Sequence, residues 1–478
     1  MNRLICALLC VSAFVLHSAA CSAAQVADSA AERMAVSVRE RALRGTVAYS
    51  FVEEITARFG PRPAGSPAER KAGEWIADEW RKFGFGNVRV EPFRLAVWSR
   101  NRDHGSIVAP FGQPLAVAAL GGSPATGAAG VEGDVVLFNT LDDLQAAAAN
   151  SLRGKVAMLN YRMPRTQSGI GYGLATAGRS QGPTMAAKAG AIAFIMRSAG
   201  TDNERYPHAG LTRYAGRSAP LPSFALSAID ANQIERLATR GSVRVRLASA
   251  ATLDMSGQSQ NVVAEIAGSE LPQEIVIIGA HLDSWDLGTG AVDDAAGIGI
   301  VTAVAKLILD SPRRPKRTLR IVLFGAEEAS QPTDPFGLFG AHAYATRYKS
   351  EITRHVIGSE SDLGSGRIFG LDLPDGFAAS DFGAQVSRVL LPLGVLVELE
   401  VPPHGGADLL PLQAAGMPVF LLKQDATTYF DLHHTAADTF DKIDRKDLEQ
   451  NVAAWSALLW LIADSEINFR APPATLAR

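Results

Sequence analysis

The apolar positions of the 478-residue chain form two alternating patterns in its C-terminal half. Short continuous apolar runs, such as EIVIIGA at 274–280 and RIVLFGA at 320–326, predict strands that are buried on both faces. Longer apolar segments at 295–310 and 447–464 have the length of buried helices. This alternation predicts an α/β fold in which helices cover a mostly parallel central sheet.

The first half of the chain divides into two parts with different patterns. Helical spacing at 26–58 and 68–85 is interrupted by the turn-rich loop FGPRPAGSP. From 113 to 252 the pattern changes to short strands, such as GDVVLFN and AIAFIMR, between Gly- and Ala-rich turns. The change predicts a small β-rich domain inserted at 113–252, so that 25–112 and 253–478 form the two parts of one larger domain.

Residues 1–24 have the pattern of a secretory signal peptide. Arg3 is followed by the apolar run LICALLCVSAFVL and then by small residues, with a cleavage position after Ala24. The run is shorter than the ~20 residues that span a bilayer. In an alternative interpretation Cys21 is the first residue of a lipoprotein, although Ser18 stands where such signals usually carry Leu. The pattern predicts a secreted or periplasmic protein with no transmembrane span in the mature chain.

Composition narrows the chemistry of any site. All three cysteines lie within residues 1–24, so metal ligands in the mature chain must be His, Asp or Glu. The net charge of −3 gives no basic excess, and a nucleic-acid partner is not expected.

Polar clusters follow four of the predicted strands at the point where each strand ends. In open α/β sheets the carboxyl ends of strands form the ligand-binding edge, so these clusters are expected to converge. Each cluster alone also fits a structural role, since acidic pairs are common in solvated turns and adjacent histidines rarely point the same way. Together, a set of only His, Asp and Glu donors fits a pair of cations such as Zn²⁺. The residues at these positions are His281, Asp283, Glu327, Glu328, Asp362, His433 and His434.

The spacing within the clusters leaves individual roles partly open. His281 and Asp283 are two residues apart on an extended segment and face one side, so Asp283 can fix the tautomer of a metal-bound His281. Of the adjacent Glu327 and Glu328, one can bind metal while the other faces a substrate water. A carboxylate that bridges two metals can come from GAVDD at 290–294, which follows a flexible LGTG turn.

Four motifs, GAHLDSWDLGTGAVDDAAG, FGAEE, ESD and HHTAADT, resemble in sequence and order those of secreted di-zinc exopeptidases of the bacterial leucyl aminopeptidase type. The plasma glutamate carboxypeptidase (carboxypeptidase Q) branch is the more similar one. The resemblance covers nearly all of the mature chain and is strongest over 275–440. It implies a phosphorylase/hydrolase-like zinc exopeptidase fold with an inserted protease-associated domain, and a tendency to form homodimers.

Transferred residue by residue, the resemblance implies a catalytic site with two Zn²⁺ ions. It places His281 and Asp362 on opposite metals and Asp293 between both. The general base that acts on a water bridging the metals is Glu327, and Asp283 orients His281. His434 is favoured over His433 as a ligand, and Asp294 is expected to make a structural contact. Independently of the resemblance, Asp286 is expected to cap or hydrogen-bond the LGTG turn. The implied metal ligands are His281, Asp293, Glu328, Asp362 and His434.

Three further residues are candidates for substrate binding. Tyr429 could polarise the scissile carbonyl, Glu360 could bind a free amine, and Trp285 could line the pocket or pack beneath the metals. The favoured function is hydrolysis of short peptides or dipeptides from an unblocked N-terminus. The alternatives are a carboxypeptidase, in which Arg213 or Lys423 could bind the terminal carboxylate, a non-catalytic binding relative, and a one-zinc transferase of the glutaminyl-cyclase type.

Overall fold

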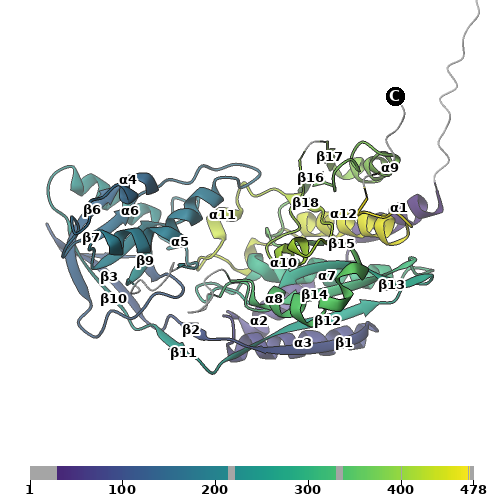
Figure 1. Cartoon of the computed structure of the whole chain (residues 1–478), viewed down its shortest axis with the longest axis horizontal. Coiled ribbons are helices and arrows are strands. Elements are labelled where there is room, and N and C mark those ends of the chain that lie inside the picture. The colour runs from purple at the N-terminus through teal and green to yellow at the C-terminus, as the bar shows by residue number, and fades with distance from the viewer. Residues whose placement is uncertain (1–28, 214–220, 330–336, 400, 472, 474–478) are drawn as a thin grey trace, which may run out of the picture.

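The computed structural model describes residues 29–213, 221–329, 337–399, 401–471 and 473. The expected signal peptide, with Cys21, lies outside these residues. The described chain forms an elongated molecule in which a region built on an eight-stranded sheet lies beside a larger region built on a five-stranded sheet (Figure 1). Among the described helices, none combines the length and apolar character that a membrane crossing requires.

The five-stranded central sheet has the order β1-β12-β14-β13-β15. Its strands are β1 (Gly86–Arg94), β12 (Gln258–Ile266), β13 (Leu271–His281), β14 (Arg317–Phe324) and β15 (His355–Glu360). β13 is parallel to both β14 and β15, but β12 is antiparallel to both β1 and β14. The prediction of a mostly parallel sheet is therefore wrong, and the sheet is mixed. An apolar run that is covered on both faces does not encode the direction of its strand.

Alternate residues of the central strands face two different helical layers, as the two-residue period of a strand requires. Val276, Ile278 and Ile321 belong to the same hydrophobic cluster as residues of α3 (Pro67–Phe83), α7 (Ala296–Leu309) and α12 (Arg445–Ala463). Ile277 and Val322 face the other layer, which is formed by α8 (Phe339–Arg347) and α10 (Leu410–Ala414). Both faces are thereby covered, which explains the continuous apolar strands.

The helical spacing at 26–58 corresponds to two helices, α1 (Ala30–Ala42) and α2 (Ala48–Phe59). A capping box between Ser29 and Glu32 begins α1. Gly45, with φ of 120°, lies in the turn that separates the helices.

The eight-stranded sheet has the order β4-β3-β10-β6-β7-β8-β9-β5 and includes one stretch of four parallel strands, β6 to β9. We call residues 103–249, from β3 to β10, the inserted region, and the rest of the described chain the main region. The strands are β3 (Asp103–Ala109), β4 (Gln113–Leu115), β5 (Val117–Ala119), β6 (Val131–Phe138), β7 (Val156–Leu159), β8 (Ala193–Arg197), β9 (Ser223–Leu226) and β10 (Arg244–Ser249).

The expected boundary at residue 113 is too late, because β3 pairs with β10 and thus belongs to this sheet. The region is also less purely β than expected. It contains α4 (Leu141–Gln145), α5 (Tyr172–Lys188) and α6 (Ala228–Ala238). The alanine-rich sequence of α5 lacks a clear amphipathic period, so the hydrophobic pattern does not predict a helix of this length.

Two short antiparallel strands, β2 (Val97–Ser99) and β11 (Thr252–Asp254), connect the two regions. A three-stranded sheet of β17 (Leu396–Glu398), β16 (Ile368–Asp372) and β18 (Leu421–Gln424) extends the main region together with α9 (Asp381–Leu390). Between the regions lies α11 (Tyr429–Leu432), which leads into the His433–His434 pair (Figure 1).

Candidate metal centre

The polar clusters converge at the carboxyl ends of β13, β14 and β15. Because these neighbouring strands are parallel, their ends lie at one edge of the central sheet. The turn at 291–295 and the segment after α11 reach the same place. Three groups of side chains there have ligand atoms within 4.8 Å of one another. The members are Asp293, Glu328, His433 and His434; His281, Asp293 and Asp362; and His281, Glu327 and Glu328.

Asp293 lies between two of these groups of side chains, and its two carboxylate oxygens face different partners. Oδ1 is 2.9 Å from Nε2 of His281, and Oδ2 is 3.1 Å from Nε2 of His434. His434 also contacts the carboxylate of Glu328 through the same nitrogen. A carboxylate that links two groups of ligands in this manner has the geometry needed to bridge two cations.

The expectation that His281 and Asp362 lie on opposite metals is wrong. Nε2 of His281 is 3.3 Å from Oδ1 of Asp362, so both belong to the same group around Oδ1 of Asp293. The reason is the sheet order: β13 and β15 are neighbours, and the residues that follow their last pairing remain close. The order of motifs along the chain does not reveal this pairing.

Two of the three histidines of the centre, His281 and His434, are held through Nδ1 by main-chain carbonyl groups. Nδ1 of His281 donates to the carbonyl of Asp283 at 2.9 Å, and Nδ1 of His434 donates to the carbonyl of Ala209 at 3.1 Å. A carbonyl oxygen can only accept, so each Nδ1 carries a proton, and Nε2 is the nitrogen that is left to bind a metal once it is deprotonated. Both imidazoles therefore present the atom that binds a metal.

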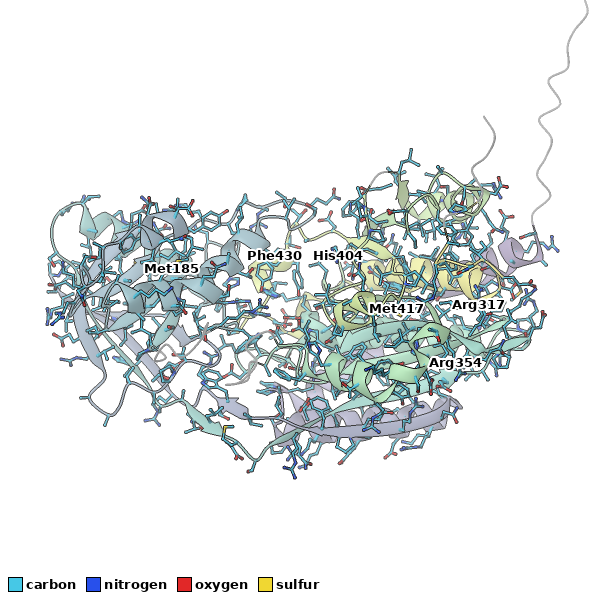
Figure 2. The ribbon with its side chains drawn as sticks, viewed as in Figure 1. Met185, Arg317, Arg354, His404, Met417 and Phe430 are labelled. Atoms are coloured by element: carbon cyan, nitrogen blue, oxygen red, sulfur yellow. The ribbon has the colours of Figure 1, made fainter. Side chains whose placement is uncertain are left out.

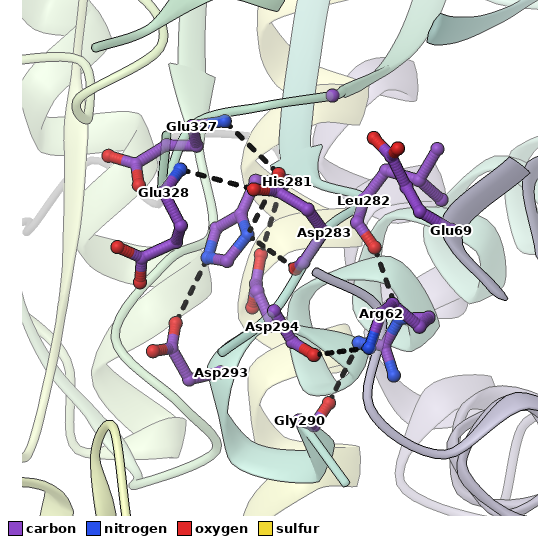
Figure 3. A network of polar contacts seen from close by, with 12 residues as sticks. Arg62, Glu69, His281, Leu282, Asp283, Gly290, Asp293, Asp294, Glu327 and Glu328 are labelled. Atoms are coloured by element: carbon purple, nitrogen blue, oxygen red, sulfur yellow. Dashed lines mark hydrogen bonds and ion pairs between the residues drawn. The ribbon is translucent and has the colours of Figure 1, made fainter. Parts of the chain in front are cut away.

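Asp283 differs from its expected role in one respect. Its carboxylate is 3.9 Å from Nδ1 of His281, and the main-chain carbonyl of the same residue orients the ring. The carboxylate instead accepts the main-chain N–H groups of Glu327 and Glu328, at 3.1 and 3.2 Å (Figure 3). Asp283 thus holds the ring and the two glutamates in one arrangement.

The centre buries more negative than positive charge. Burial raises the pKa of Glu327 and of Asp294 well above the usual range, and neighbouring carboxylates add to the effect. Burial opposes the charged form of His434, yet Glu328 and Asp293 raise the pKa of its imidazole to about 9. Such a cluster is stable only with added protons or cations, and its nitrogen and oxygen donors fit Zn²⁺.

Three residues fix the loop that carries Asp293. Asp438 accepts the main-chain N–H groups of Val292 and Asp293, at 2.6 and 3.3 Å. Asp294 accepts the N–H of His281 at 3.1 Å, which is consistent with the structural contact expected for it. The buried guanidinium of Arg62 donates to the carbonyls of Leu282, Thr289 and Gly290 (Figure 3). Asp438 belongs to the HHTAADT motif but was not recognised as a positioning residue.

Asp286 lies outside the centre. Its carboxylate pairs with Arg100 at 2.8 Å, so it links the loop to the segment that enters the inserted region. The expected bond to the LGTG turn is not among the contacts of the described residues.

His433 and His434 both face Asp293. The rings stack with centroids 3.5 Å apart, and Nε2 of His433 is 3.7 Å from Oδ2 of Asp293. This arrangement depends on the left-handed backbone of His434, with φ of 63°, which turns two adjacent side chains to one side. His434 makes the shorter contact with Asp293 and also reaches Glu328.

A cavity of about 700 Å³ adjoins the centre and is lined by both regions of the chain. We call it the central cavity. Tyr429 and Glu360 line it, whereas Trp285 packs its ring 5.5 Å from that of His434 and lines a second cavity on the other side of Glu328. One carboxylate oxygen of Glu360 accepts the N–H of Asp408 at 2.8 Å. Its other oxygen has no hydrogen-bond partner among the described residues.

The two cations considered for a terminal carboxylate also line the central cavity. Lys423 is paired with Glu398 at 2.7 Å. Arg213 likewise engages other groups of the chain.

Comparison with known proteins identifies the family of the chain. Residues 261–459 match Peptidase family M28. Human carboxypeptidase Q is 33% identical over 420 residues, which cover 87% of this chain and 85% of that protein. The crystal structure of a Peptidase M28 precursor from Shewanella amazonensis has a TM-score of 0.88 and 41% identity, and the match covers 93% of this chain and 99% of that one. The zinc aminopeptidase BSAP from Bacillus subtilis shares the fold, with a TM-score of 0.62 and 21% identity over 88% of this chain and 95% of that one. The chain belongs to peptidase family M28 and is a zinc-dependent metallopeptidase.

Proposed function

We propose that the chain is a di-zinc exopeptidase that removes the N-terminal residue from short peptides, above all dipeptides. The observation that carries the proposal is the position of Asp293 between two groups of ligand side chains. His281 and Asp362 would complete one metal site. Glu328 and His434 would complete the other, with His433 as a neighbouring imidazole. The imidazole and carboxylate donors, without a thiolate, suit Zn²⁺ in a hydrolytic site.

The protein groups around the metals account for the proton transfers. Zinc ions held by these residues would supply a water of lowered pKa and polarisation of the scissile carbonyl. Glu327 would take the proton from the attacking water and pass it to the leaving amine. Burial raises the pKa of Glu327 well above its ordinary value, which makes this carboxylate a stronger base. Asp283 keeps Glu327 in place through its main-chain N–H.

Two residues of the central cavity would orient the substrate. Burial raises the pKa of Tyr429 well above its ordinary value, so its hydroxyl keeps its proton and can donate to a carbonyl oxygen. Glu360 has a buried carboxylate oxygen that no described residue hydrogen-bonds, and this oxygen is suited to a free α-amine. Trp285 supports the ring of His434 from the opposite side of the centre.

Metal content and a peptide panel test the proposal. Zinc-loaded protein is expected to hold two zinc ions per chain and to cleave Ala-Ala and Leu-Ala, but not their N-acetylated forms. Equal cleavage of the acetylated peptides would instead establish a carboxypeptidase. One zinc ion without peptidase activity would favour the transferase, and a folded protein that cleaves nothing would favour a binding relative.

We also propose that the inserted region is a protease-associated domain, and that residues 1–24 direct the chain to secretion or to the periplasm. The parallel strands β6 to β9 and the helix α5 give this region a fold of its own, packed beside the metal centre. N-terminal sequencing of the mature protein is expected to find Gln25 as the first residue. A lipid-modified Cys21 would contradict cleavage after Ala24. Sedimentation of the mature protein would test the homodimer.

A further inference from the structure

The central cavity reaches from the metal centre to the three-stranded sheet of β17, β16 and β18 (Figure 1). Asp372 and Lys423 line this end of the cavity, and the proposed mechanism uses neither of them. Asp372 is the last residue of β16 and is 2% exposed. Its Oδ1 has no hydrogen-bond partner among the described residues. This end of the cavity therefore contains a buried carboxylate oxygen that is free to bind a ligand.

The register of the sheet places three charged groups on one face. Asp372 lies opposite Glu398 of β17. Gly370, two residues before Asp372, lies opposite Lys423 of β18. Residues that are opposite each other, or two apart on one strand, point to the same face. A Cβ atom on Gly370 would lie 2.9 Å from Oε1 of Glu398 and 3.3 Å from Cδ of Lys423, so this glycine leaves the room in which the two side chains meet.

Lys423 compensates the charge of Asp372 only in part. Its Nζ donates to Glu398 at 2.7 Å but is 3.7 Å from Oδ1 of Asp372, which is beyond hydrogen-bond distance. Burial raises the pKa of Asp372 to about 6 although Lys423 lowers it, and Glu398 adds to the rise. The carboxylate is still ionised at neutral pH, and two carboxylates then share one ammonium. A second cation at Oδ1 would supply the missing partner.

The walls beside Asp372 are largely uncharged. Leu421 lies opposite Asp372 on β18 and lines the cavity. The segment after β17 adds Leu410 and His404, the latter labelled in Figure 2. Burial, with Lys423 nearby, lowers the pKa of His404, so its imidazole is neutral at pH 7. Such a wall suits the methylene chain of a lysine or arginine, whose charged end alone needs a polar partner.

Asp372 also lies within reach of a residue whose α-amine is bound by Glu360. Gly358 of β15 forms a bridge with Val419, two residues before β18, so β18 lies beside β15. Because β16 is the next strand, Asp372 lies two strand spacings, on the order of 10 Å, from Glu360. An extended lysine, with a hydrogen bond at its α-amine and another at its side-chain ammonium, has a comparable span.

We propose that Asp372 is a specificity-determining residue, which binds the cationic side chain of a lysine or arginine at the N-terminus of the substrate. The inference rests on the proposed exopeptidase function and adds a class of substrate to it. Glu360 holds the α-amine, and Asp372 holds the charge at the end of the side chain. The sheet fixes Asp372 before the substrate binds, so little ordering is required of the protein.

The test compares Lys-Ala with norleucyl-Ala, which lacks only the side-chain ammonium. The zinc-loaded wild type is expected to prefer Lys-Ala about tenfold in kcat/KM, as for one charge-assisted hydrogen bond. Asp372→Asn is expected to remove this preference by lowering kcat/KM for Lys-Ala, with that for norleucyl-Ala hardly changed. Calorimetric binding of lysinamide and norleucinamide is expected to give the same ratio without turnover.

Asp464→Asn is the matched control. Asp464 is also a buried carboxylate of the main region and pairs with Arg313 at 2.5 Å, but it is not among the residues that line the central cavity. This variant should keep the wild-type preference for Lys-Ala. Thermal unfolding and zinc content are measured for every variant, and the two wild-type comparisons decide the question even where a variant does not fold.

Three results would overturn the inference. The first is equal kcat/KM for Lys-Ala and norleucyl-Ala in the wild type, with equal binding of the two amides. The second is an Asp372→Asn variant that loses both activities in equal proportion. The third is a preference for Glu-Ala over Gln-Ala that Lys423→Met abolishes, which would assign this end of the cavity to an acidic side chain.

The proposed function and the inference can fail separately. Cleavage of no peptide would refute the exopeptidase function, while tighter binding of lysinamide than of norleucinamide, lost in Asp372→Asn, would still support a cation site at Asp372. Cleavage of both peptides at equal rates would refute the inference and leave the exopeptidase function intact.

Discussion

Nδ1 of His434 donates a hydrogen bond to the main-chain carbonyl of Ala209, and the N–H of Ala209 donates to the carbonyl of His434 at 2.9 Å. Ala209 belongs to the inserted region, whereas His434 belongs to the main region. The inserted region therefore fixes the tautomer of one proposed metal ligand. Its contact with the main region is part of the metal centre as well as part of the cavity wall.

This contact predicts that loosening the inserted region weakens zinc binding. Arg165 forms a bidentate pair with Asp431, three residues before His434, and Thr201 also donates to that carboxylate. Asp431→Ala removes these bonds without touching a ligand. We expect zinc to dissociate about tenfold more readily from one of the two sites, measured by competition with a chelator.

An ion pair within the inserted sheet provides the control. Glu132 pairs with Arg244 and Arg246 on exposed strands. Glu132→Ala is expected to leave zinc retention unchanged. Equal retention in both variants would contradict a role of the interface in metal binding.

Two of the four aspartates in the segment 279–294, Asp293 and Asp286, should respond differently to removal. Asp293→Ala deletes the carboxylate that both ligand groups share, so the protein is expected to lose zinc outright. Asp286→Ala breaks the ion pair with Arg100. Because the Asp286 side chain is partly exposed, this variant should mainly lower the free energy of unfolding, by about 1 kcal/mol. Zinc content and thermal unfolding separate the two. Retention of both ions by Asp293→Ala would refute the bridging role.

Glu327→Gln tests the assignment of the base. The amide keeps the size of the side chain and leaves the main-chain bond to Asp283 in place, but it cannot accept the proton. We expect kcat to fall about 10²- to 10⁴-fold with both zinc ions retained. Because Glu327 lies close to Glu328 and His281, metal content must be measured on the same preparation. A variant that keeps wild-type turnover would assign the proton transfer to another group.

The sequence predicted the residues of the centre better than their connections. Polar residues after apolar strands identified His281, Glu328 and Asp362, because strand period and strand ends are encoded locally. Which of them share a metal depends on strand order, and the sequence carries no local signal for that order. Hence His281 and Asp362 were assigned to opposite metals, although they lie 3.3 Å apart.

Other contacts could not have been predicted from side-chain type. Ala209 acts through its main-chain carbonyl, so its side chain gives no indication of its role. The direction of β12 was likewise unpredictable, because a strand covered on both faces has the same apolar pattern in either direction.

A histidine far from the metal ligands in the sequence predicts how stability depends on pH. His355 is fully buried at the start of β15, where Nδ1 donates to the carbonyl of Glu351 and Nε2 accepts from the hydroxyl of Tyr344 at 2.8 Å. Burial lowers the pKa of His355 to about 4 from its ordinary value of 6.5, and nearby Arg320 and Arg354 act in the same direction. Between these two pH values the unfolded chain binds a proton that the folded chain does not.

The contribution of His355 to stability is therefore complete above pH 6.5 and is lost as the pH falls toward 4, by up to about 3 kcal/mol. His355→Gln cannot titrate, so its free energy of unfolding should decline less over this range, even though it is lower at pH 7. Denaturant unfolding of zinc-free wild type and variant at pH 7, 6, 5 and 4.5 measures the difference. Because other groups, including His281 and His434, titrate in both proteins, their effects cancel in that difference. Parallel pH profiles for the two proteins would show that His355 is not the titrating group.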